Sequence, residues 1–210
     1  MLSMTLLLIS GICWTTVYIA CIKIGVSKKT YCMPVFALAL NIAWEIIYAA
    51  NGTALAVSSN SPMDPQSIVN WAWAICDLFI VYTFFRYGKQ WMPKTLRKHF
   101  MLVGLLIFAT GLAAQLAFYL KLPWIEAAQY SAFAQNVIMS ILFIAMYYYR
   151  KGPEGQSLVL AIAKCIGTLA PTLQQGLVDG FNIYILIMGG VCFVWDLIYI
   201  ALLAKDKKRS

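Results

Sequence analysis

The sequence predicts an all-α polytopic membrane protein, a bundle of seven transmembrane helices. Hydrophobic residues make up 62% of the 210-residue chain and charged residues only 11%, and the mean hydropathy is +0.76. Soluble domains are closer to half apolar and a quarter charged. Seven apolar segments are each long enough to cross the hydrocarbon core, which takes about 20 helical residues. In chain order they are about 2–22, 31–50, 68–85, 100–120, 126–149, 158–178 and 181–203. We expect residues 1–210 to form this single transmembrane domain.

The residues between these segments mark where each one ends. Residues 1–10 lack a basic stretch and lead directly into a full-length span, so the first helix is expected to remain in the protein. Lysines separate the first two segments, and "NSPMDPQS" at 60–67 is a turn-rich stretch in the loop between the second and the third. Basic residues follow the third segment, and "RKGPEGQS" at 150–157 separates the fifth from the sixth. Asp179-Gly180 is a turn signal before the last segment.

Basic residues predict the orientation, because they are concentrated in alternate connections. Three follow the first segment, five the third and two the fifth, and four are in the tail, against Lys121 alone on the other side. They are Lys23, Lys28, Lys29, Arg86, Lys89, Lys94, Arg97, Lys98, Arg150, Lys151, Lys205, Lys207, Lys208 and Arg209. Basic loops stay in the cytoplasm, so we expect the N-terminus outside and the C-terminus cytoplasmic. The net charge of +8 then reflects this topology and the anionic lipid bilayer, without a nucleic-acid partner.

The cysteines and acids give no signal for a metal or cofactor. The six cysteines fall within or at the edges of the spans, and none forms a CxxC or a Cys/His spacing. We expect them to be reduced and structural. No Asp-Asp pair is present, so a mechanism that ionises a magnesium-bound diphosphate lacks its ligands. The sequence therefore predicts no metal site and no cofactor.

Four ionisable residues lie well inside the spans, namely Glu45, Asp77, Lys164 and Asp196. Each is costly in a bilayer, so each should face the bundle interior and find a partner. They could clamp the helices together or form a functional site. Asp77 is the strongest candidate for a purely structural role.

The two acid segments have matching patterns. Trp195, Asp196 and Tyr199 in the seventh segment are spaced like Trp44, Glu45 and Tyr48 in the second. Helical spacing also puts Asn41, Glu45 and Tyr48 on one face of the second segment. In the same way it puts Asp196 and Tyr199 on one face of the seventh. Each acid should therefore have a hydrogen-bonding neighbour on its own helix.

Depth in the membrane separates the two acids. Glu45 lies roughly 21 Å from the cytoplasmic end of its segment, and Asp196 roughly 22 Å from the outer end of its own. Lys164 reaches the depth of Asp196 and would keep it ionised, unless its side chain extends to the surface. Glu45 has no base at its level and should stay protonated. Both would face one apolar cavity whose aromatic rings could stabilise a carbocation. The candidate rings belong to Trp14, Trp44, Tyr48, Trp73, Tyr82, Tyr130 and Tyr199.

The stretch "YCMPVFALALNIAWEIIY" at 31–48 resembles helix 2 of a known family. These are the integral-membrane terpene cyclases of fungal meroterpenoid and indole-diterpene pathways, which also occur in some bacteria. The matching residues are Tyr31, Met33, Asn41, Ala43, Trp44 and Glu45. Asp196 and Tyr199 are similar to the D-x-x-Y of the family's second acid motif.

The resemblance implies a proton-initiated cyclisation of a polyprenyl chain, without a metal, of the isomerase or lyase type. Its catalytic acids would be Glu45, which starts the reaction by protonating an epoxide or alkene, and Asp196, which helps to finish it. Supporting residues would be Asn41, Trp44, Tyr48, Asp77, Lys164, Trp195 and Tyr199. The substrate would be a hydrophobic prenylated or epoxidised molecule. We expect the endoplasmic reticulum membrane in a eukaryote and the plasma membrane in a bacterium.

A different function class remains open on the sequence alone. A small seven-helix carrier for sugars or metabolites, built from parallel three-helix repeats, would have the same length, helix count and topology. Such a carrier is expected to have Pro-Gln pairs inside its helices. The only Pro-Gln here, Pro65-Gln66, lies between predicted segments.

Overall fold

The computed structural model describes residues 1–207, which form seven long helices with no strand among them. They are α1 (Leu2–Ser27), α2 (Val35–Ser59), α3 (Pro65–Tyr87), α4 (Phe100–Lys121), α5 (Trp124–Tyr149), α6 (Leu158–Leu173) and α7 (Ile183–Lys207). Two 3₁₀ turns, Gly88–Trp91 and Arg97–His99, lie between α3 and α4, and a π turn, Gln174–Val178, follows α6. All seven helices, counting the turns next to them, are long and apolar enough to cross a membrane. The predicted seven-helix bundle is confirmed.

The second helix departs most from its predicted range of 31–50. It starts at Val35, directly after Pro34, because proline has no backbone N–H and is therefore favoured at a helix start. The helix then continues to Ser59 and ends at Asn60, which has a left-handed backbone (φ 50°). Gly52 does not end it: a Cβ there would lie 1.7 Å from Oγ of Ser67 on α3. The glycine permits close packing between α2 and α3.

The sixth helix also ends earlier than predicted. Pro171 lies inside α6 and cannot donate to the carbonyl of Gly167 one turn before it. The hydroxyl of Ser10 on α1 donates to that carbonyl instead, at 2.9 Å. The α-helix stops two residues after the proline, and the chain widens into the π turn. Such turns are frequent at functional sites.

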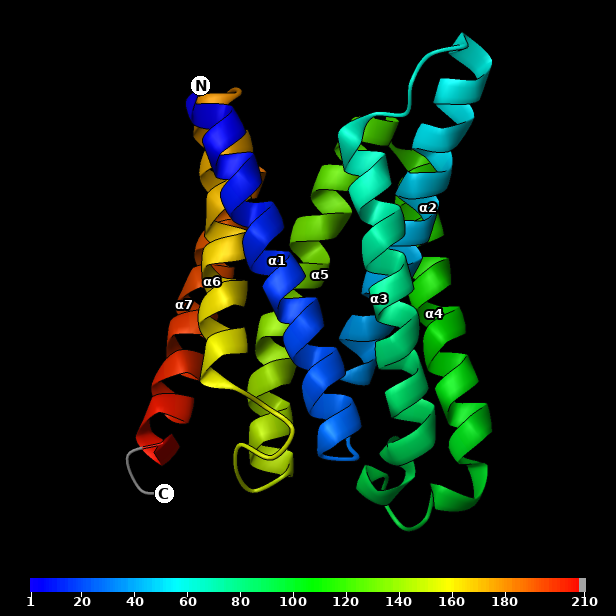
Figure 1. Cartoon of the computed structure of the whole chain (residues 1–210), viewed down its shortest axis with the longest axis vertical. Helices are drawn as coiled ribbons and strands as arrows, with labels where there is room; N and C mark the ends of the chain where they lie inside the picture. Colours follow the sequence, from blue (N-terminus) through cyan, green and yellow to red (C-terminus); the bar gives the residue numbers. More distant parts are fainter. Residues whose placement is uncertain (208–210) are drawn as a thin grey trace.

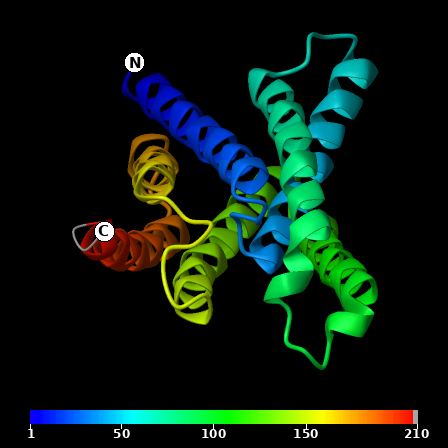
Figure 2. The same cartoon turned by 60° about the horizontal axis from the view of Figure 1, so that its bottom comes forward.

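The seven helices pack as two groups, α6 with α7 and α2 with α3 and α4, which α1 and α5 connect. α1 packs against α6 and α3, and α5 packs against α7, α2 and α4, so these two helices join the α6–α7 pair to α2, α3 and α4 (Figure 1, Figure 2). α2 contacts α3, α4 and α5 and is the most buried of the seven spans. Gly111 of α4 permits part of this packing, because a Cβ there would lie 2.7 Å from the backbone of Ala39.

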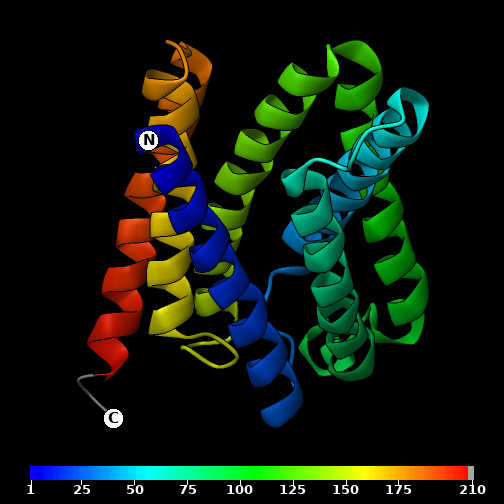
Figure 3. The same ribbon diagram turned by 45° about the horizontal axis from the view of Figure 1, so that its top comes forward.

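The two ends of the bundle are packed differently. Met1 and the end of α7 lie at opposite ends of the bundle, and α5 is visible between α1 and α3 near the N-terminal end (Figure 1, Figure 3). The buried hydrophobic cluster fills the other end, with members such as Cys21, Phe143, Leu160 and Tyr199. The basic connections after α1, α3 and α5 lie at this packed end, as predicted. Lys208 and Arg209 of the expected basic tail lie outside the described residues, and which end faces the cytoplasm stays a prediction.

Candidate active site

A cavity of about 930 Å³ lies between α1, α2, α3, α5 and α6, in the half of the bundle with the N-terminus. Its exposed lining residues include Met4, Gln66 and Trp124, which lie in the first turns of α1, α3 and α5. Buried side chains, among them Tyr18 and Glu45, form its inner end. The cavity therefore opens toward the N-terminal end of the bundle and is closed toward the packed end.

Glu45 forms part of this inner end, and its side chain is only 1% exposed. The hydroxyl of Tyr18, on α1, donates a hydrogen bond to Oε1 of Glu45. Nδ2 of Asn41, one turn earlier on α2, donates a second hydrogen bond to Oε1 at 2.9 Å, as the helical spacing predicted. Oε2 has no hydrogen-bond partner within residues 1–207. Two donors thus hold one oxygen of the carboxyl group, and the other oxygen has no donor within residues 1–207.

Asn41 also connects Glu45 to a second buried carboxyl, Asp77 on α3. Nδ2 of Asn41 lies 2.9 Å from Oδ2 of Asp77. Oδ1 of Asn41 accepts from Gln135 at 3.3 Å, and Gln135 in turn accepts from Gln115 at 2.7 Å. No lysine or arginine in the described part of the chain forms an ion pair with either carboxyl. Burying even one charge without a partner is costly, and two adjacent charges cost more, so the pair retains at least one proton.

Aromatic rings line the cavity around Glu45. Trp44 and Tyr48 lie on α2 with ring centroids 5.0 Å apart, and Nε1 of Trp44 donates to the backbone of α5 at 2.9 Å. The ring of Trp73 stacks on Tyr18 at 5.6 Å, and Trp14 lies 6.3 Å from Tyr18 on its own helix. Of the seven predicted rings, the other three, of Tyr82, Tyr130 and Tyr199, are outside the cavity lining. An apolar ligand next to Glu45 would face several ring surfaces.

The cavity offers hydrogen bonds to a ligand rather than positive charge. Within residues 1–207 its lining includes Glu45 and Asp64 but no Lys, Arg or His. Its polar groups are otherwise hydroxyls and amides, many of them asparagine or glutamine. No group of three or more His, Cys, Asp or Glu side chains in the same residues could hold a metal ion.

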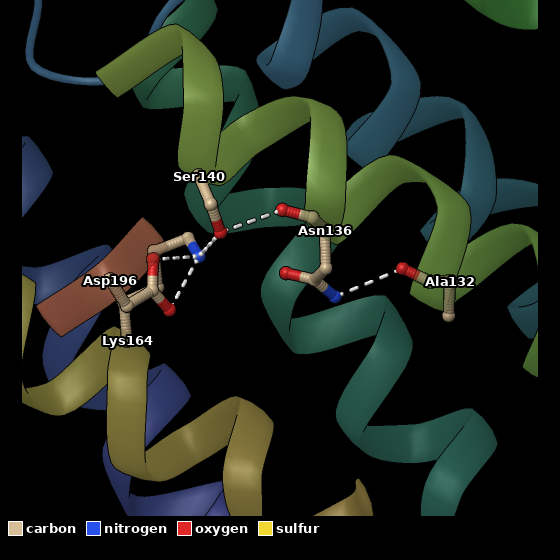
Figure 4. A network of polar contacts seen from close by, with 5 residues as sticks. All are labelled: Ala132, Asn136, Ser140, Lys164 and Asp196. Atoms are coloured by element: carbon tan, nitrogen blue, oxygen red, sulfur yellow. Dashed lines mark hydrogen bonds and ion pairs between the residues drawn. The ribbon is translucent and has the colours of Figure 1, made fainter. Parts of the chain in front are cut away.

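Lys164 and Asp196 form a buried ion pair on α6 and α7 (Figure 4). Nζ of Lys164 lies 2.9 and 3.0 Å from the two carboxylate oxygens of Asp196 and 2.7 Å from Oγ of Ser140 on α5. The two side chains are 0% and 1% exposed. The predicted contact between Lys164 and Asp196 is therefore present, and Lys164 does not extend to the surface.

This ion pair lies one turn of α5 away from the cavity. Ser140 donates to the backbone oxygen of Asn136 at 2.9 Å, and Asn136 lines the cavity (Figure 4). Lys164, Asp196 and Ser140 are not in the lining. We expected both acids to face one cavity, and the structure differs, because α5, α6 and α7 pack together at the level of Asp196.

The other α7 residues predicted for the site also lie elsewhere. Tyr199 is fully buried and stacks on Phe143 at 5.3 Å, and its hydroxyl has no partner within residues 1–207. Trp195 lines a shallow groove formed by α7 alone. The repeated acid pattern of helices 2 and 7 therefore does not produce two equivalent environments. Tyr18 and Gln135, in contrast, belong to the Glu45 network but were not predicted from the sequence.

A sequence model of the Pyr4-like transmembrane terpene cyclases matches residues 1–177. The chain belongs to this family. The match covers the whole cavity lining and the Glu45 network, whereas α7 with Asp196 lies beyond it. The predicted family is confirmed, and the protein is an integral membrane protein. The carrier interpretation loses its support.

Relatives with assigned names are similar over most of the chain. The Pyr4-family terpene cyclase mfmH of Annulohypoxylon moriforme is 30% identical over 167 residues, which are 78% of this chain and 66% of that protein. Terpene cyclase andB of Emericella variicolor is 29% identical over 174 residues, 80% of this chain and 69% of that protein. Terpene cyclase pyr4 of Aspergillus fumigatus is 25% identical over 164 residues, which are 77% of this chain and 65% of that protein. The chain thus spans about two thirds of the length of these relatives. No solved structure matches it.

Proposed function

We propose that this protein is a membrane terpene cyclase in which Glu45 protonates the terminal epoxide or alkene of a polyprenyl, meroterpenoid-type substrate. The observation that carries the proposal is the position of Glu45, a buried acid without a basic partner at the inner end of an apolar, aromatic cavity. A carboxylic acid that is kept neutral by burial can act as a general acid at neutral pH.

The first step transfers a proton from Glu45 to the epoxide oxygen or the alkene carbon. With an epoxide, the C–O bond breaks as the proton arrives, and the carbon left electron-deficient is attacked by the next double bond of the chain. The negative charge that develops on Glu45 is stabilised by the donors already bound to it, the hydroxyl of Tyr18 and the amide of Asn41. The proton lost from the final cation balances the one that Glu45 donated, so the net change is an isomerisation.

The cavity then protects the cation. The rings of Trp14, Trp44 and Trp73 line the same cavity as Tyr18 and Glu45, and ring faces attract positive charge. The apolar walls keep water away from the cation, which would otherwise be captured as an alcohol. Such a reaction needs no metal and belongs to the isomerase or lyase type. The site would lie in the endoplasmic reticulum membrane of a eukaryote or the plasma membrane of a bacterium.

Asp196 takes a different role in this proposal from the one that the family resemblance implied. Because its carboxylate is held by Lys164 outside the cavity lining, it acts as a positioning residue. The ion pair and Ser140 fix α5, α6 and α7 to one another directly below Asn136. These contacts hold the shape of the inner end of the cavity, where the carbocation would cyclise.

The test compares Glu45→Gln with the matched control Glu126→Gln, at an exposed position in the first turn of α5. Both proteins are expressed in membranes and assayed on a prenylated phenol with a terminal epoxide. Glutamine keeps the size and hydrogen bonding of Glu45 but cannot deliver a carboxylic proton. We expect the first variant to accumulate normally and leave the substrate uncyclised, and the control to match the wild type. Substantial cyclisation by Glu45→Gln would refute the proposal.

A further inference from the structure

Two glutamines at the open end of the cavity have amide oxygens that lack a partner. Gln174 and Gln175, in the π turn after α6, both line the cavity. Oε1 of each is buried and accepts no hydrogen bond within residues 1–207. An unpaired buried acceptor is unfavourable unless a ligand or water supplies a donor.

The orientation of the Gln174 amide is determined by its neighbours. Nε2 donates to Oγ of Ser3 and to Oδ2 of Asp179, both at 3.1 Å. Because an ionised carboxylate only accepts hydrogen bonds, the nitrogen must face Asp179 and the oxygen must face away from it. The side chain itself is 9% exposed. Gln174, which lines the cavity, therefore has an amide of fixed orientation whose oxygen is unpaired.

The π turn is what places both glutamines on the wall. Pro171 interrupts the hydrogen bonding of α6, and the backbone N–H of Asp179 then bonds to the carbonyl of Gln174, five residues earlier, at 2.8 Å. The wider turn packs closely on α7, since a Cβ on Gly176 would lie 2.7 Å from Leu186. The turn is thus held in place from the side opposite to the cavity.

This acceptor pair lies far from Glu45. Ser3, which binds Gln174, and Tyr18, which binds Glu45, are both on α1 and are fifteen residues apart in the chain. At 1.5 Å per residue the two contacts are about 22 Å apart along the helix. A ligand that reaches both ends must therefore be long, with a polar group at one end and a reactive apolar group at the other.

We propose that Gln174 and Gln175 form the subsite for the head group of the substrate, and that this head group is neutral and carries hydroxyl donors. Two carbonyl acceptors select donors, and the absence of Lys, Arg and His from the lining within residues 1–207 disfavours a diphosphate or carboxylate. The substrate then binds with its head group toward the cavity opening and its distal prenyl end against Glu45. This proposal rests on the proposed function, because it assigns the other end of the same substrate.

The test uses two substrates that differ in one donor, a prenylated phenol with a terminal epoxide and its O-methyl ether. The wild type should prefer the phenol by roughly tenfold in kcat/KM, mainly through KM, because the ether leaves the acceptors unpaired. Gln175→Leu and Gln174→Leu should each reduce this preference, and the double variant should remove it. Gln90→Leu, an exposed glutamine at the other end of the bundle, should keep it. The ratio of two substrates on one preparation does not depend on how much protein is folded.

Binding without turnover separates this proposal from the proposed function. The dissociation constants of the same two compounds are measured by tryptophan fluorescence in the Glu45→Gln background, with and without the glutamine variants. A preference for the phenol that disappears in the double variant supports the subsite, whether or not Glu45→Gln is inactive. A preference that is unchanged by both glutamine variants, or that is absent in the wild type, overturns it even if Glu45 proves to be the acid.

Discussion

Glu45 and Asp77 share a single hydrogen-bond donor, Nδ2 of Asn41, which lies 2.9 Å from an oxygen of each carboxyl group. The two acids come from different helices and are both almost fully buried. Because the neutral donors Asn41 and Tyr18 cannot compensate two adjacent buried negative charges, we expect Glu45 and Asp77 to share at least one proton. Four predictions follow from these two acids and from the ion pair on α6 and α7.

The Asp77→Asn variant tests whether the second carboxyl supports the first. Asparagine preserves the size of the side chain but removes the second proton site. We expect cyclisation to fall by roughly tenfold without a change in the products, because Glu45 still delivers the proton. Infrared spectroscopy should show a protonated carboxyl band at neutral pH in the wild type, weaker or shifted in Asp77→Asn and lost in Glu45→Gln. Unchanged kinetics and an unchanged band in Asp77→Asn would restrict Asp77 to packing.

Tyr18→Phe removes one donor to Glu45 while keeping the ring that stacks on Trp73. A hydrogen bond to a group that becomes charged contributes about 1.5–3 kcal/mol, so kcat should fall roughly 10- to 100-fold. Thermal stability should change little, because the ring contacts remain. Tyr148→Phe, at an exposed position of α5, serves as the control. A fall in KM alone, or equal effects of both variants, would contradict the proposed charge stabilisation.

Lys164→Met leaves the Asp196 carboxylate buried without its cation. Breaking a buried pair in this way costs about 3–5 kcal/mol, so the variant should unfold at a lower temperature or denaturant concentration. The double variant Lys164→Met/Asp196→Leu removes both charges and should recover much of the loss. A double-mutant cycle without coupling between the two positions would show that the ion pair does not hold the helices together.

Asp196→Asn tests the division of labour between the two acids, since Glu45 and Asp196 belong to separate hydrogen-bond networks. With initiation intact and the inner end of the cavity loosened, cations should form and then lose the wrong proton or capture water. Product analysis should show partly cyclised or hydroxylated compounds, unlike the unreacted substrate from Glu45→Gln. Indistinguishable product profiles for the two variants would instead indicate a single coupled acid pair.

Orientation in the membrane can be tested with single cysteines in the two kinds of connection. Ser61→Cys lies between α2 and α3, and Lys94→Cys lies between α3 and α4, and both positions are exposed. The positive-inside rule places position 94 in the cytoplasm and position 61 opposite. A membrane-impermeant thiol reagent added outside intact cells or to sealed vesicles should therefore label only one of them, with the wild type as background control. Labelling of both from the same side would contradict the seven-span topology.

The sequence predicted what depends on periodicity and on charge in the membrane. The face shared by Asn41 and Glu45 follows from a spacing of four residues, and the Lys164–Asp196 contact follows from matching depth and opposite charge. Tyr18 could not be predicted in the same way. An aromatic residue on a membrane helix usually packs against its neighbours, and its bond to Glu45 depends on how α1 approaches α2.

The predictions that were wrong, for the surroundings of Tyr199 and for the end of α2, also failed because of packing between helices. Tyr199 lies one turn from Asp196, so its helical phase was correct, but the packing of α5 against α7 decides whether that face meets a cavity or a core. The end of α2 was predicted too early, because the helix continues past Gly52, where the missing Cβ permits close packing on Ser67 of α3. Both outcomes depend on neighbouring helices, which a pattern along one helix does not contain.

Because the cavity is closed at its inner end, it limits how a substrate can enter and a product can leave. Substrate and product must use the same opening, which is bordered on α1 by exposed apolar side chains such as Leu8 and Ile12. Under the proposed function each turnover would be an exchange, in which the rigid cyclised product has to leave before the next flexible chain can enter. If the proposed function holds, both molecules would be exchanged on the side of the membrane where the N-terminal end of the bundle lies. Enzymes that act before or after this one gain direct access to its substrate and product only if their own sites open to that side.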